Sequence, residues 1–140
     1  MAEIDQEKTL IKLDQLESYL AELKRVVPGS YAEYQTIEKR RSTERLLQLS
    51  IEAVLDTCNL IVSELDLGLP SGEADLFDKL AQKGIITEEM KRKLYEMRGF
   101  RNILVHEYAS VDDRLVYETA KEKLGDFRNF ADQIKGALQS

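Results

Sequence analysis

Apolar residues recur along this chain at spacings of three and four, the period of a helix that buries one face. The first such stripe ends at the helix-stopping segment Pro28-Gly29-Ser30 and comprises Leu13, Leu16, Leu20, Leu23 and Val27. After a short helical turn over 31–35, a long helix is predicted from about Thr36 to Leu65. Its apolar arc comprises Leu47, Ile51, Val54, Cys58, Ile61 and Leu65. The segment Gly68–Gly72, which includes a proline, is expected to end it.

The second half of the chain predicts three more helices. A short helix spans about 72–83, opened by Ser71 or Gly72, with Gly84 just past its end. A longer helix, capped by a threonine, spans about 87–108. The last begins at 112 or 113 and is expected to be continuous, since its stripe keeps one rhythm over Val116, Ala120, Leu124, Phe127, Ala131, Ile134 and Leu138.

Four long amphipathic helices joined by modest loops can bury their apolar stripes only against one another. The predicted fold class is therefore all-α: an antiparallel, up-and-down four-helix bundle with 72–83 as an additional short helix. A length of 140 residues fits one domain, and no repeat, linker or low-complexity tract divides it, so 1–140 is expected to form a single unit.

The formal net charge of −6 argues against a generic nucleic-acid coat and against docking on an anionic membrane. The charge is unevenly distributed, however. Residues 91–101 contain five basic side chains and one acid, and residues 38–45 contain four basic side chains and two acids. A cleft between these segments is expected to attract phosphate, so the binding of a nucleic acid there should weaken with salt.

Several kinds of chemistry lack their residues in this chain. It has no glycine-rich phosphate loop and no serine-hydrolase elbow, and one histidine with one cysteine cannot make an ordinary zinc site, so no metal or cofactor is expected. Cys58 lies among apolar residues and is interpreted as a core residue. No basic leader segment and no apolar run of about 18 residues is present, which predicts a cytoplasmic protein that does not span a membrane.

The helix over 87–108 carries the candidate chemistry. Arg101 falls on its apolar stripe, where a guanidinium needs a carboxylate partner or an anionic ligand. Asn102 and His106, four residues apart, project side by side from another face. Gly99 in the interior of a helix suggests that something packs closely against it.

The same helix is apolar around most of its circumference, because Phe100 and Ile103 cover the side that remains between the polar pair and the apolar stripe. One bundle core cannot absorb that much apolar surface, which indicates a subunit interface. Arg101 and His106 lie about 140° apart around an ideal helix and about 7.5 Å along it, so they do not point the same way. Either the long arginine swings round, or two copies paired about a two-fold axis contribute both residues to one cleft.

The long helix over 36–65 has a polar face opposite its apolar arc. A solvated face is the plain interpretation of such a pattern. The face is also the natural source of a carboxylate for Arg101, from Glu52 or Asp56. Its members are Arg41, Arg45, Gln48, Glu52, Asp56, Asn59 and Ser63.

These residues carry a resemblance to a known family. The segment Arg101-Asn102-Ile103-Leu104-Val105-His106-Glu107-Tyr108 is similar to the R-x4-H-x-Y signature of the HEPN superfamily, in its small HepT-like branch. The segment Glu44–Glu52, with the pattern E-R-x-x-Q-x-x-x-E, also resembles that branch, as does Met97-Arg98-Gly99-Phe100 just before the signature. The resemblance extends over most of the chain.

The resemblance implies a homodimeric helical bundle in which paired R-x4-H motifs form a composite cleft. Many members are metal-independent endoribonucleases that act as toxins, each with a small nucleotidyltransferase antitoxin that adds AMP to the tyrosine of H-x-Y. Carried over, Arg101 and His106 are the catalytic candidates, with Asn102 as an orienting residue and Tyr108 as the modification site. Supporting roles fall to Glu52, Arg45 and Gln48. The dimer would form through the helix over 87–108.

Cleavage without a metal ion can use the ribose 2′-OH as nucleophile. His106 would remove its proton while Arg101 offsets the charge that develops on phosphorus. Two other functions remain open: a non-catalytic substrate-binding or adaptor subunit of a two-component nucleotidyltransferase, in which Arg101 only binds phosphate, and a helical dimer without activity of its own.

Overall fold

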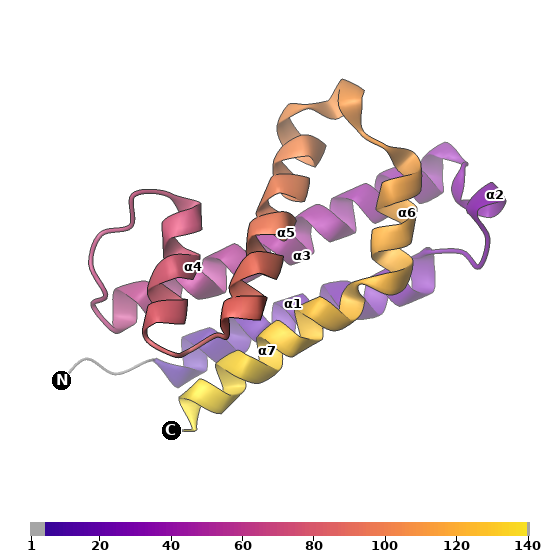
Figure 1. Ribbon diagram of the computed structural model, residues 1–140. Coiled ribbons are helices and arrows are strands. Elements are labelled where there is room, and N and C mark those ends of the chain that lie inside the picture. Colours follow the sequence, from indigo (N-terminus) through magenta and orange to yellow (C-terminus); the bar gives the residue numbers. More distant parts are fainter. Residues whose placement is uncertain (1–4, 140) are drawn as a thin grey trace.

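The computed structural model describes residues 5–139, except for the side chain of Tyr108, and this part of the chain is helical without strands (Figure 1). The all-α prediction is confirmed. The helices in chain order are α1 (Gln6–Val26), α2 (Tyr31–Tyr34), α3 (Ile37–Glu64), α4 (Glu73–Gln82), α5 (Glu88–His106), the 3-10 turn η1 (Tyr108–Ser110), α6 (Asp113–Glu122) and α7 (Leu124–Leu138).

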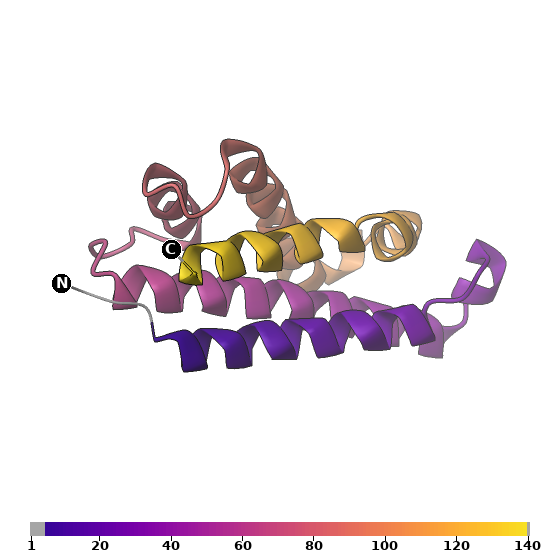
Figure 2. The same cartoon turned by 90° about the horizontal axis from the view of Figure 1, so that it is seen from below.

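The long helix α3 is the centre of the fold, since every other α-helix contacts it. Helix α1 packs along α3 in an antiparallel pair, and α7 lies beside both (Figures 1 and 2). Helices α5 and α6 stand at a steep angle to these three and are joined by the segment 107–112 (Figure 1). The candidate site residues lie on α3 and on this steep α5, except for Tyr108, which begins η1.

Side chains at the predicted positions start several helices. Thr36 and Thr87 each accept a hydrogen bond from the backbone N–H three residues on, at 3.3 and 3.0 Å, which satisfies a free donor of the first turn. Asp112 caps α6 in the same way. Helix α4 ends at Gln82, and Gly84 adopts a left-handed φ of 78° that suits a residue without a Cβ.

The prediction of one continuous last helix is wrong. The chain breaks at Lys123, whose φ of −110° and ψ of 10° leave the helical region, and α7 starts at the next residue. The break lets α6 pack against α2 and α3 while α7 packs against α1 and α5. Gly125, a weak helix former, lowers the cost of interrupting the helix here. Because Ala120 and Leu124 stay buried on either side of the break, the apolar positions keep a helical spacing through it and hide it.

The core is formed by the predicted stripes together with three phenylalanines, Phe77, Phe127 and Phe130, each nearly or fully buried. Burial of such a side chain contributes on the order of 1.5–3 kcal/mol. Cys58 is fully buried, and burial raises the pKa of its thiol, as expected of a structural cysteine. Helix α3 is long and apolar enough to cross a membrane by length and composition, but most of its apolar window is covered by the other helices, as in a core helix.

Candidate active site

Arg101 lies on α5 with its side chain only 13% exposed, between two carboxylates from other helices. Its Nη2 donates a hydrogen bond to Oε1 of Glu73, and its Nη1 lies 4.0 Å from Oε2 of Glu52. Withdrawing a guanidinium from water is costly unless it is paired. The prediction that Arg101 needs a carboxylate is confirmed, and Glu52 is one of the two that surround it.

Glu73, the nearer carboxylate, was not predicted from the sequence. It is the first residue of α4, and its Oε1 also accepts a hydrogen bond from Nε of Arg98 at 3.1 Å. Burial raises the pKa of this carboxyl, but the hydrogen bonds and charges of the two arginines outweigh burial and hold its pKa below the usual value. The short link between Gln82 and Glu88 was the available signal, because a short connection makes consecutive helices antiparallel neighbours.

The polar side chains of α3 contact different parts of the structure. Gln48 donates from Nε2 to Oε2 of Glu52 at 3.3 Å and so extends the polar cluster around Arg101. Asp56, the alternative partner for Arg101, instead lies 3.5 Å from Nζ of Lys12 on α1. Arg45 is exposed and forms no hydrogen bond or ion pair with these residues within the described part of the chain. We call Gln48, Glu52, Glu73, Arg98 and Arg101 the arginine cluster.

His106 is the last residue of α5 and is exposed, whereas Asn102 is half-buried. Within residues 5–139, neither side chain forms a hydrogen bond or ion pair with Arg101. The helix is unbroken from Arg101 to His106, so the two residues keep the separation of an ideal helix, about 7.5 Å along the axis and about 140° around it. One chain does not bring them together.

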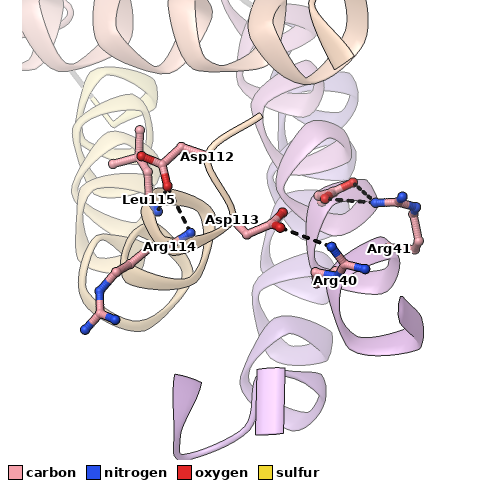
Figure 3. Close-up of polar contacts among 7 residues, drawn as sticks. Arg40, Arg41, Asp112, Asp113, Arg114 and Leu115 are labelled. Atoms are coloured by element: carbon pink, nitrogen blue, oxygen red, sulfur yellow. Dashed lines mark hydrogen bonds and ion pairs between the residues drawn. The ribbon is translucent and has the colours of Figure 1, made fainter. Parts of the chain in front are cut away.

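The segment 107–112, which follows His106, is fixed at its far end by polar contacts with α3 (Figure 3). Asp112 accepts hydrogen bonds from the backbone of Arg114 and Leu115, and Asp113 accepts one from Nη1 of Arg40 at 3.1 Å. Tyr108 starts the 3-10 turn in this segment. Its side chain, the predicted modification site, lies outside the described residues.

A different face of α5 borders an apolar groove of about 360 Å³ between α5, α6 and α7. The apolar side chains that line it are Ile51, Met97, Phe100, Ile103, Leu115 and Phe127. Gly99 also borders it, and nothing lies within 4 Å of a Cβ built at this position. The expectation that something packs closely on Gly99 is therefore wrong within one chain. The apolar surplus predicted for α5 does face this groove.

The positive charge expected on α5 is largely neutralised by acids that the fold brings to it. A count along the sequence includes only the acids of the same segment and cannot include those of other helices. Four of the five basic side chains in 91–101 have carboxylate partners: Lys91 with Glu88 at 2.9 Å, Lys93 with Asp126 at 3.0 Å, and Arg98 and Arg101 with Glu73. Residues 5–139 contain no cluster of three histidine, cysteine or acidic side chains that could hold a metal ion.

Comparisons with known proteins identify relatives of this chain. The family model described as "Ribonuclease HepT-like" matches residues 16–134. The tRNA nuclease HepT of Aphanizomenon flos-aquae is 31% identical over 128 residues, covering 91% of this chain and 87% of that protein. The mRNA nuclease HepT of Shewanella oneidensis is 38% identical over 89 residues, covering 64% of this chain and 67% of that protein.

The fold is also similar to that of solved toxin structures. The tri-AMPylated HEPN toxin of Shewanella oneidensis, in complex with its MNT antitoxin, superposes with a TM-score of 0.85 at 30% sequence identity and covers 91% of this chain and 96% of that one. The residues matched by the family model, 16–134, include the arginine cluster and His106. They also include all of α3 and α5, the helices with the E-R-x-x-Q-x-x-x-E and R-x4-H patterns. The chain belongs to the HepT-like ribonuclease family.

Proposed function

We propose that this protein is a metal-independent endoribonuclease, the toxin of a pair whose second member is a small nucleotidyltransferase. The observation that carries the proposal is the arrangement on α5: Arg101 is nearly buried and held by carboxylates, and His106 is exposed one and a half turns further on. Nuclease relatives and the toxin–antitoxin complexes of similar fold support it.

In the proposed reaction the ribose 2′-OH of the RNA attacks the adjacent phosphorus, and the bond from phosphorus to the 5′-oxygen of the next nucleotide breaks. The products are a 2′,3′-cyclic phosphate and a 5′-hydroxyl, whose oxygen takes a proton from water as it leaves. His106 removes the hydroxyl proton, because a neutral imidazole can act as a general base. Arg101 offsets the negative charge that develops on the phosphoryl oxygens, and Asn102 orients the reacting groups. The proposed proton removal and charge stabilisation require no metal ion or cofactor.

We propose a homodimer through α5, because one chain does not bring Arg101 and His106 together. The apolar groove beside Phe100 and Ile103 supports this, since a partner seated there would remove exposed apolar surface from water. The space at Gly99 would allow the partner's close approach. His106, one turn beyond Ile103, would then lie at the edge of the interface.

Loss of RNA cleavage in two variants tests the nuclease proposal. Arg101→Ala and His106→Ala should each cleave a defined RNA substrate at least ~10²-fold more slowly, as expected when a general base or a charge-stabilising group is removed. Arg128→Ala, which removes an exposed arginine from α7, is the matched control and should retain activity. If both active-site variants cleave RNA as fast as the wild type in a preparation free of contaminating nuclease, the proposal is wrong.

We further propose that the nucleotidyltransferase silences the protein by adding AMP to Tyr108. Incubation of the two proteins with ATP, followed by intact-mass analysis and peptide mapping, should locate AMP on Tyr108, and Tyr108→Phe should prevent it. Tyr19→Phe is the matched control and should be modified as the wild type is. A stable stoichiometric complex with neither modification nor RNA cleavage would instead favour the non-catalytic adaptor function.

A further inference from the structure

Glu73, which no sequence motif indicated, joins α4 to the proposed catalytic arginine. We propose that Glu73 is a positioning residue for RNA cleavage: it fixes the guanidinium of Arg101 in the orientation that the reaction requires. This inference rests on the proposed function, since it assumes that Arg101 contacts the reacting phosphate.

The geometry around Arg101 leaves its guanidinium little freedom. Oε1 of Glu73 accepts from Nη2, while Oε2 of Glu52 lies 4.0 Å from Nη1, the other terminal nitrogen. Glu52 is itself held by Gln48 at 3.3 Å. A planar group with carboxylates at both terminal nitrogens has one favourable orientation, and a guanidinium has five N–H donors, so donors remain for a phosphate.

Glu73 is also fixed, because it binds a second arginine. Nε of Arg98 donates to the same Oε1 at 3.1 Å, so the carboxylate is held from two successive positions on one face of α5. The lowered pKa of Glu73 keeps it ionised at neutral pH. Two arginines and two glutamates balance in charge within the cluster, so removal of one carboxylate would leave a nearly buried guanidinium with excess positive charge.

Helix α4 has other contacts that keep it in place without Glu73. Phe77 and Leu80 are buried in the core, and Asp78 accepts a hydrogen bond from the hydroxyl of Tyr95 on α5 at 2.5 Å. Asp78 therefore provides a link between the same two helices that is independent of Arg101. The positioning role of Glu73 can be separated from its contribution to packing.

The test compares Glu73→Gln with Asp78→Asn, each of which neutralises one carboxylate that links α4 to α5. Glu73→Gln should lower kcat for RNA cleavage by roughly 10- to 100-fold, because small misplacement of a reacting group is costly, with a much smaller change in KM. Glu73→Asp, which keeps the charge, should recover part of kcat. Asp78→Asn should keep kcat within about two-fold of the wild type, assayed well below the unfolding temperature.

Three outcomes would overturn the inference. Equal kcat for Glu73→Gln and Asp78→Asn would mean that Glu73 only contributes to packing. No recovery of kcat in Glu73→Asp, with the fold intact, would mean that the charge of residue 73 does not position Arg101. Faster cleavage by Glu73→Gln would mean that Glu73 competes with the substrate phosphate for Arg101.

A measurement without RNA separates this inference from the proposed function. In NMR spectra of arginine side chains, Arg101 should show slow rotation of its guanidinium in the wild type and in Asp78→Asn, and faster rotation in Glu73→Gln. Unchanged rotation in Glu73→Gln would refute the positioning of Arg101 by Glu73. If instead the wild type cleaves no RNA while the rotation responds as expected, the proposed function fails and Glu73 still fixes Arg101.

Discussion

Replacing Tyr34 with phenylalanine is expected to stabilise the protein, although it removes a polar group from the interior. The Tyr34 ring is fully buried in an aromatic cluster, with ring centroids 6.1 Å from Tyr31 and 5.2 Å from Tyr117. Its hydroxyl has no hydrogen-bond partner within residues 5–139. Burial, followed by the nearby carboxylates of Glu44 and Asp113, raises the pKa of the phenol, so the group stays neutral.

The expected gain follows from the cost of an unsatisfied polar group. A buried hydroxyl without a partner costs ~1–3 kcal/mol, whereas the phenylalanine ring keeps the aromatic contacts. We therefore expect Tyr34→Phe to raise the free energy of unfolding by about 1 kcal/mol, or the melting temperature by roughly 3 °C for a chain of this size. Tyr117 provides the opposite case in the same cluster, since its hydroxyl donates to the backbone oxygen of Pro28 at 3.2 Å. Tyr117→Phe should lose about 0.5–1.5 kcal/mol.

Urea unfolding followed by far-ultraviolet circular dichroism measures both variants against the wild type. The midpoint should move up for Tyr34→Phe and down for Tyr117→Phe, with unchanged slopes. If Tyr34→Phe lowers the free energy of unfolding as much as Tyr117→Phe does, the Tyr34 hydroxyl is hydrogen-bonded in solution, and the reasoning from an unsatisfied group is wrong.

Three further predictions concern the interface, a turn and the arginine cluster. Phe100→Asp should dissociate the proposed dimer in analytical ultracentrifugation, whereas Ile11→Asp, on an exposed position of α1, should not; an intact Phe100→Asp dimer would exclude the groove as the interface. Gly84→Ala should cost about 1 kcal/mol in urea unfolding, because a Cβ is unfavourable at a φ of 78°, and no loss would contradict this. The pKa of Glu73 is lowered on folding, so the wild type should be more stable than Glu73→Gln above about pH 4.5, where an unfolded glutamate is ionised. This stability difference should be lost as pH falls through the folded pKa. A difference that is unchanged at pH 3 in urea unfolding would refute the prediction.

Sequence patterns predicted the helices because helix formation depends on neighbours along the chain. The stripe periodicity placed α1, α3 and α5, and Thr36 and Thr87 start their helices as capping residues do. The break at Lys123 was not predictable in this way, since the apolar positions continue through it with a helical spacing. The helix breaks because α6 and α7 pack against different helices and must run in different directions to reach them. These packing partners are a property of the whole fold.

In the candidate site, too, some features follow from the local sequence and others depend on how the helices pack. A guanidinium on an apolar helix face must find a carboxylate, so the need of Arg101 for a partner could be derived from its position alone. Which carboxylate it finds depends on packing between helices. Glu52 was on the expected face of α3, but Asp56, one turn away on the same face, pairs with Lys12. For Glu73, the short link after α4 indicates only that α4 packs beside α5, and it does not show which residue of α4 contacts Arg101.

Ion pairs also change what the basic residues can contribute to RNA binding. Of the nine basic side chains counted in 38–45 and 91–101, only Arg45 and Arg92 lack a hydrogen bond or ion pair within residues 5–139. The logarithm of the RNA-binding constant falls linearly with the logarithm of the salt concentration. Its slope would be about −6 if all nine basic side chains neutralised phosphates of single-stranded RNA. The slope would be about −2 if only Arg45, Arg92 and Arg101 did so. We expect the shallower slope, because each of the other six cations would have to leave its partner to bind a phosphate. That partner is a carboxylate for all of them except Lys39, which donates to the backbone oxygen of Val26. A measured slope near −6 would mean that these ion pairs break on binding and that the acids of other helices do not shield α5.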